Sequence, residues 1–234
     1  MNKLFLLAFL LGFSFSVVAQ QADSATYLST LKQELTVQWP KNRTINLVFH
    51  GHSVPAGYWH DHEVHTLESY PNLLLAKLKS LYPYAVINVI VTAIGGENAI
   101  KGQTRFEQDV LIHKPDVLFI DYALNDRFSD IGKVKEAWSA MIQAALARNI
   151  KVVLLTPSPD QRLDILDAKN PLEPHVQQIH QLAEQHHVGL ADPYTQFKRV
   201  AKRGELTNYM SHVNHPNKAG HEIIVNELLK WFTK

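Results

Sequence analysis

Four short blocks along the chain carry groups that together could cleave an ester. In chain order they are Gly51-His52-Ser53, Gly95-Gly96-Glu97-Asn98, Leu124-Asn125-Asp126 and His215-Pro216-Asn217. A serine hydroxyl can attack an acyl carbon, and an imidazole with a pKa near neutrality can take the serine proton and return it to the leaving group. The ordered set predicts acyl transfer, with Ser53 as nucleophile and His215 as base.

The same blocks offer N–H groups for the negative charge that develops on the carbonyl oxygen. Gly51 allows a tight turn that can present the N–H of Ser53, and Gly96 allows close approach of the backbone. The amide of Asn125 adds an N–H that keeps its proton. We expect an oxyanion hole formed by Ser53, Gly96 and Asn125. Taken singly, each block could instead be an ordinary turn or a helix cap.

Strands and helices alternate between these blocks. Short apolar runs predict five strands, at residues 44–49, 85–92, 116–122, 151–156 and 188–191. Helical spacing and stop signals predict helices at residues 27–37, 67–81, 134–146, 174–187 and from about 216 to 231. This order predicts a parallel sheet of about five strands with helices on both faces. Ligands bind such sheets beyond the carboxyl ends of the strands, and the first three blocks follow the first three strands.

Composition and charge narrow the class of protein. The chain has 234 residues, of which 46% are hydrophobic and 19% charged, with a net charge of +1. This balance suits one globular domain with a substantial core. The interspersed charges do not form the basic surface of a nucleic-acid-binding protein. With no cysteine there is no disulfide framework, so stability must come from the core.

The first residues have the pattern of a secretory signal peptide. Asn2-Lys3 gives a positive start, residues 4–18 are mostly apolar, and Val17-Val18-Ala19 suits cleavage after Ala19. The apolar run is shorter than the ~20 residues of a spanning helix, which argues against a retained anchor. We therefore expect a signal peptide at 1–19, a lead segment at 20–42 and a catalytic domain at 43–234. The mature protein would be periplasmic or extracellular, with no stable membrane anchor.

The order of the four blocks resembles that of the SGNH (GDSL-like) hydrolases, over about residues 44–232. The resemblance implies a three-layer α/β/α, flavodoxin-like fold. It also implies that Ser53 is the nucleophile, that Gly96 and Asn125 are oxyanion donors and that His215 is the base. Members of this family use no metal or organic cofactor. They include carbohydrate acetylesterases, thioesterases and lysophospholipases.

Two positions depart from the family pattern. His52 replaces the usual Asp of Gly-Asp-Ser, a position whose role in the family is mainly structural. His212 replaces the Asp that usually stands three residues before the base, where a carboxylate would orient the imidazole and stabilise its cation. Either a backbone carbonyl orients His215, giving a Ser–His dyad, or another carboxylate does so. We favour the dyad. The candidate carboxylates are those of Asp126, Asp160 and Asp192.

The segment after the nucleophile is rich in polar and aromatic side chains. His60-Asp61-His62-Glu63-Val64-His65 could bind a metal, contact substrate or be solvated, and no second ligand-rich segment completes a metal site. We expect no metal there. Tyr58, Trp59 and His60 are candidate substrate-binding residues, because an aromatic ring can pack on a sugar.

These observations predict a secreted serine esterase that removes short acyl groups, acetyl above all, from a small-molecule or glycan ester. A second hypothesis is a lipolytic esterase or thioesterase for longer acyl chains, although no apolar insertion supplies a lid. A third is a catalytically inactive carbohydrate-binding protein on the same scaffold, prompted by the missing acid at position 212.

Overall fold

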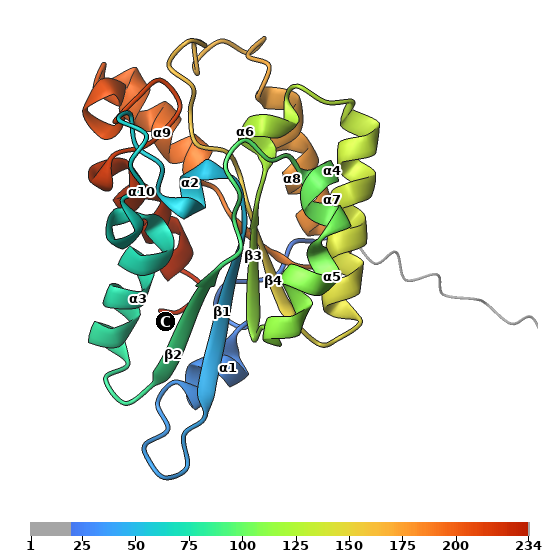
Figure 1. The fold of residues 1–234 in the computed structure, drawn as a ribbon, viewed down its shortest axis with the longest axis vertical. Helices are drawn as coiled ribbons and strands as arrows, with labels where there is room; N and C mark the ends of the chain where they lie inside the picture. Colours follow the sequence, from blue (N-terminus) through green and yellow to red (C-terminus); the bar gives the residue numbers. More distant parts are fainter. Residues whose placement is uncertain (1–19, 234) are drawn as a thin grey trace, which may run out of the picture.

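The computed structural model describes residues 20–233 (Figure 1). The predicted signal peptide, residues 1–19, lies outside the described residues. Within the described part of the chain, no helix is both long enough and apolar enough to cross a membrane.

A five-stranded parallel sheet forms the centre of the molecule. Its strands are β1 (Thr44–Gly51), β2 (Val86–Val91), β3 (Val117–Asp121), β4 (Lys151–Leu155) and β5 (Gly189–Ala191). The strand order is β2-β1-β3-β4-β5, and every neighbouring pair is parallel. All five predicted strands are therefore present. Their apolar side chains cover both faces, because both faces are packed under helices.

The helices lie in two layers on either side of this sheet (Figure 1). The α-helices are α1 (Ser29–Glu34), α2 (Ser53–Ala56), α3 (Tyr70–Leu81), α4 (Ala99–Thr104), α5 (Phe106–Asp109), α6 (Ala123–Asp126), α7 (Ile131–Leu146), α8 (Glu173–His186), α9 (Pro193–Lys202) and α10 (Lys218–Leu229). Short 3-10 segments are η1 (Thr66–Glu68), η2 (Leu111–His113) and η3 (Leu206–Tyr209). The predicted three-layer α/β/α architecture is confirmed.

Alternate side chains of each strand enter separate cores. Leu47 and Phe49 of β1 pack with α1, α3, α9 and α10 on one face. Val48, between them, packs with α4, α5, α7 and most of α8 on the other. This period of two is the geometry of an extended strand. The lead segment belongs to the first core, because Leu31 of α1 and the flanking Leu28 and Leu35 are buried there.

Several helix boundaries differ from those predicted, for local reasons. α3 begins at Tyr70 rather than residue 67, because the 3-10 segment η1 occupies residues 66–68. α10 begins at Lys218, because Asn217 caps it: its Oδ1 accepts from the N–H of Gly220 at 3.1 Å. α4, α5 and α9 were not predicted. α9 starts with a capping Asp192 followed by Pro193, a recognised start signal.

The strand order places a topological switch point between β1 and β3. From β1 the chain passes to β2 on one side, and β3 then pairs with β1 on the other. α2 follows β1 and α6 follows β3, and both lie at the same end of the sheet (Figure 1). Crevices at such points bind ligands in open α/β sheets.

Glycine is required at position 51, where β1 meets β3. A Cβ on Gly51 would lie 2.5 Å from the carbonyl oxygen of Asp121 and 2.8 Å from Cγ of Pro55. We expect Gly51→Ala to lower the free energy of unfolding by about 1–3 kcal/mol, as overpacking does, measured by denaturant unfolding. Gly132→Ala is the control, since the new methyl meets only the Asp130 side chain, at 3.2 Å. Equal stability of the two variants would contradict the requirement.

Candidate active site

The hydroxyl of Ser53 and the imidazole of His215 form a hydrogen-bonded pair. Ser53 is the first residue of α2, directly beyond β1, and His215 lies three residues before α10. Their Oγ and Nε2 atoms are 3.0 Å apart, although 162 positions separate the residues in sequence. A proton can therefore pass directly from the hydroxyl to the ring.

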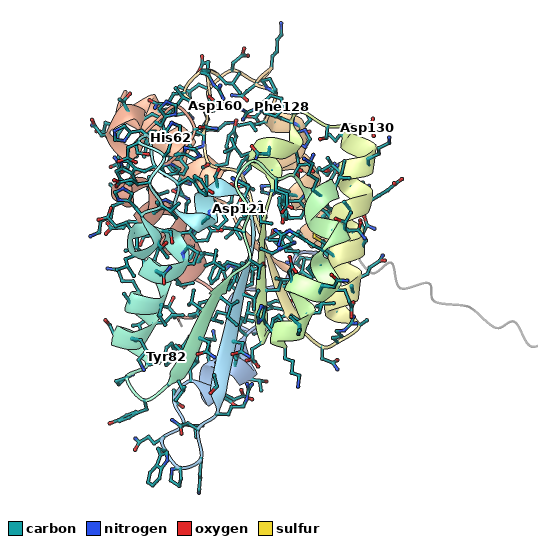
Figure 2. All side chains as sticks on the ribbon, viewed as in Figure 1. His62, Tyr82, Asp121, Phe128, Asp130 and Asp160 are labelled. Atoms are coloured by element: carbon teal, nitrogen blue, oxygen red, sulfur yellow. The ribbon has the colours of Figure 1, made fainter. Side chains whose placement is uncertain are left out.

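His52 takes over the local role of a capping carboxylate. The ring is fully buried, and its Nδ1 accepts a hydrogen bond from the N–H of Val54 at 3.3 Å. Because Nδ1 accepts, the proton of a neutral ring resides on Nε2. That nitrogen is 3.4 Å from Oδ1 of Asp121, whose Oδ2 accepts from the hydroxyl of Tyr70 at 3.1 Å. Figure 2 shows Asp121 near the centre of the molecule, at the carboxyl end of β3. The departure at position 52 thus keeps the start of α2 capped.

The two other predicted oxyanion donors lie on neighbouring loops that are bonded to each other. Gly96 is in the loop after β2, with a φ of +76° that favours glycine. Asn125 lies in α6 after β3, and its Nδ2 donates to the carbonyl of Glu97 at 2.9 Å. A side-chain amide has two N–H groups, so one remains for a ligand. The structure therefore joins Asn125 to the residue directly after Gly96.

A buried polar network holds this pair of loops, and the sequence analysis did not identify it. The Glu97 carboxylate accepts from Nε of Arg105 at 3.0 Å and from the hydroxyl of Tyr122 at 3.0 Å. That hydroxyl also lies 3.0 Å from Nε2 of His50. One sequence signal could have indicated this network: Glu97 directly follows Gly96 at the predicted site. A carboxylate that is buried there needs hydrogen-bonding partners. Glu97 is therefore a positioning residue for the backbone carbonyl that holds Asn125.

Backbone contacts fix the loop that carries His215. Its carbonyl accepts from the N–H of Ser211 at 2.9 Å, and residues 210 and 216 form an antiparallel bridge. The N–H of Gln161 donates to the carbonyl of Val213 at 2.6 Å, and Nε2 of Gln161 donates to that of His212 at 3.2 Å. The segment after β4 thus supports the histidine loop.

None of the candidate orienting groups bonds to His215. Its Nδ1 is buried and has no hydrogen-bond partner among residues 20–233, so neither a backbone carbonyl nor a carboxylate orients it. Asp126 accepts from Ala99 and Trp138, Asp160 from two arginines, and Asp192 from Thr156 and Thr195. These carboxylates have structural partners elsewhere. The His215 ring is instead flanked by two other rings. The ring centroids of Tyr58 and His212 each lie 6.4 Å from that of His215, with interplanar angles of 30° and 29°.

This environment makes His215 a weak base. Burial, together with the positive charge that His52 and His212 carry when protonated, lowers the pKa of His215 to about 4. The ring is therefore neutral, and able to accept a proton, over the whole range above about pH 4.

The three predicted substrate-binding residues have different surroundings. Tyr58 belongs to the site, because its ring flanks His215 and would contact a Cβ on Gly95 at 3.1 Å. Trp59 instead stacks on His65 within its own loop, with ring centroids 4.5 Å apart. His60 is exposed.

The metal-capable cluster is arranged differently from a set of three histidines. Asp61, Glu63 and His65 place one ligand atom each within 4.8 Å of one another, and His60 and His62 are outside this group. The His65 ring faces carboxylates, with Nε2 3.3 Å from Glu63. Exposed carboxylates around a histidine are common on protein surfaces and do not by themselves define a metal site.

Comparisons of sequence and fold relate the chain to known proteins. The model of the GDSL-like lipase/acylhydrolase family matches residues 49–223. No curated protein gives a significant sequence match.

Several solved structures share the fold. The acetylxylan esterase of Geobacillus stearothermophilus superposes with a TM-score of 0.71 at 19% identity, over 81% of this chain and 94% of that chain. A two-domain esterase active on acetylated mannans gives 0.70 at 20% identity, over 88% of this chain and 52% of that chain. Another acetyl xylan esterase gives 0.64 at 21% identity, over 79% and 98%. At these identities the likeness establishes the fold.

The pKa of His215 predicts the pH profile. Protonated His215 cannot accept the Ser53 proton, so kcat/KM should fall only as the pH drops through about 4. His212→Asp would place a carboxylate near the ring, favour the imidazolium and move this acidic limb upward. His212→Ala is the control and should retain substantial activity. Loss of the positive charge at position 212 should raise its acidic limb less than the new carboxylate of His212→Asp does. An unmoved limb in His212→Asp would show that residue 212 does not influence His215.

The free N–H of Asn125 predicts an effect on kcat. Asn125→Ala should lower kcat by an amount corresponding to about 3 kcal/mol, with little change in KM, because an oxyanion donor acts mainly in the transition state. Steady-state kinetics on a p-nitrophenyl ester measures both constants. A change confined to KM would make Asn125 a substrate-binding residue instead.

Proposed function

Because the chain belongs to the GDSL-like lipase/acylhydrolase family, we propose that it is a serine esterase that removes acetyl or other short acyl groups from a carbohydrate. Carboxylic ester hydrolysis follows from the family. The residue roles, the acyl group and the sugar are the proposal. The observation that carries the roles is the 3.0 Å contact between Oγ of Ser53 and Nε2 of His215 at the switch point of the sheet.

The first half of the proposed reaction acylates Ser53. His215 takes the hydroxyl proton on Nε2 while Oγ attacks the ester carbonyl. The N–H groups of Ser53 and Gly96 and the free amide N–H of Asn125 bind the oxyanion. The imidazolium then gives its proton to the sugar oxygen as the C–O bond breaks, which leaves an acyl-serine. In the second half, His215 activates water, which releases the acid and restores the hydroxyl.

The carbohydrate preference has two supports. The solved structures described above include esterases that act on acetylated xylan or mannan. In addition, the ring of Tyr58 flanks His215, where an aromatic surface can pack against a sugar.

Export is part of the proposal. It rests on the amino-acid pattern of residues 1–19, with a positive start, an apolar centre and Ala19 at the expected cleavage position. An esterase for glycans outside the cytoplasm would act in the periplasm or beyond the cell.

Acyl-chain preference tests the function. We expect hydrolysis of p-nitrophenyl acetate with a much higher kcat/KM than p-nitrophenyl octanoate, and release of acetate from acetylated xylo-oligosaccharides. Ser53→Ala should abolish both activities while circular dichroism shows an intact fold. A preference for the octanoate would favour the lipolytic alternative. No turnover by folded wild-type protein, with retained glycan binding, would favour the inactive carbohydrate-binding alternative.

A further inference from the structure

A second cavity lies beside the candidate active site. It has a volume of about 350 Å³ and is lined by Arg127, Phe128, Asp160, Arg162, Leu163 and Pro171. Figure 2 shows Phe128 and Asp160 at the upper end of the molecule, beyond the sheet. Arg127 is two residues after Asn125. Gln161, between Asp160 and Arg162, bonds to the loop that carries His215. The segments that line the cavity are therefore connected both to the helix that carries Asn125 and to the loop that carries His215.

The charges in this cavity do not balance. Nη2 of Arg127 donates to Oδ2 of Asp160 at 2.5 Å, and Arg162 donates to both oxygens of the same carboxylate, at 2.9 and 2.5 Å. One carboxylate thus serves two guanidinium groups, which leaves one positive charge uncompensated. His175, whose ring feels the charge of Arg127, adds no charge at neutral pH, because burial and that charge lower its pKa.

The uncompensated charge is poorly solvated. The side chain of Arg127 is only 5% exposed, and its Nη1 is buried with no acceptor among residues 20–233. Burial lowers the pKa of Arg127, which reflects the cost of keeping its charge away from water. A second anion in the cavity would offset that cost.

The remaining lining suits a sugar ring. Phe128 is 75% exposed, and its ring lies over the guanidinium carbon of Arg127 at 4.5 Å. Because so little of the ring is packed, it can shift and offer its face to a ligand. Arg162 is 57% exposed, so the part of its guanidinium that does not face Asp160 can meet an incoming anion. The volume is at the lower end of the range for small-ligand sites and admits one sugar unit.

We propose that this cavity is a subsite for a sugar acid, in which the carboxylate of a uronate next to the acylated sugar faces Arg162 and Arg127 and its ring packs on Phe128. A planar guanidinium matches a carboxylate geometrically and holds it with charge-assisted hydrogen bonds. This inference rests on the proposed carbohydrate substrate, and it selects glycans that carry uronic acids over neutral ones.

Calorimetric titration of the wild-type protein tests the subsite. The probes are a deacetylated xylo-oligosaccharide that bears one glucuronate and a neutral xylo-oligosaccharide of equal backbone length. We expect the charged probe to bind at least about tenfold more tightly at low salt, as one charge-assisted contact allows. Arg162→Gln should remove this preference. Arg203→Gln is the matched control, because Arg203 is 54% exposed and also paired with a carboxylate.

The outcomes separate the subsite from the esterase function. Arg203 lies outside both the proposed active site and the subsite, so Arg203→Gln should hydrolyse p-nitrophenyl acetate at the wild-type rate. Equal affinity for the two probes, or equal loss of the preference in the two variants, would overturn the subsite. Displacement of the charged probe by an equal concentration of acetate or inorganic phosphate would also overturn it, as simple anion binding. A retained preference without ester hydrolysis would support the subsite and refute the proposed function.

Discussion

The close parallel pairing of β1 with β3 is the constraint on which the candidate site depends. Gly51 pairs with Asp121 at the last position of the register, and only a hydrogen in place of Cβ lets the backbones and Pro55 approach so closely. The turn beyond Gly51 carries Ser53, and the turn beyond Asp121 carries Asn125. The two turns therefore begin at the same edge of the sheet, because the two strand ends are paired, and ligands bind open α/β sheets beyond such an edge.

Buried polar groups then fix the positions of those loops. Hydrogen bonds are directional, so they define these positions more narrowly than apolar packing does. Asn125 depends on the carbonyl of Glu97, and the Glu97 carboxylate depends on Arg105 and Tyr122. Removing one member would leave a buried charge or donor without a partner, which costs more than the bond itself contributes. Such a network tolerates few alternative arrangements. Asn125 is thus held in place without a ligand, which is the condition that its proposed role in an oxyanion hole requires.

The sequence predicts the sheet well, because five buried strands leave five apolar runs. It also predicts that Ser53 and His215 lie close together, because one follows the first strand and the other precedes the last helix. The sequence does not predict the role of a residue where that role depends on partners far away along the chain. Asp192 was a candidate acid, yet it caps α9, and the Asp-Pro signal for that helix was local and available. The bond between Glu97 and Asn125 joins residues 28 positions apart and leaves no local pattern. Nor does any spacing rule reveal that Nδ1 of His215 is buried without a hydrogen-bond partner in the described part of the chain.

The missing acid has opposite effects on the two proton transfers proposed for His215. A pKa of about 4, which is lowered chiefly by burial, makes the ring a poor acceptor for the serine proton, and among residues 20–233 no carboxylate bonds to Nδ1 to stabilise the cation that forms. The same low pKa makes that cation a strong donor to a departing sugar oxygen, which is a basic leaving group. Asp121 cannot correct the first effect directly, since its oxygens face His52 and Tyr70. In the proposed reaction, His215 therefore favours expulsion of the alcohol over attack by the serine, and the proposed oxyanion donors would supply more of the stabilisation during attack.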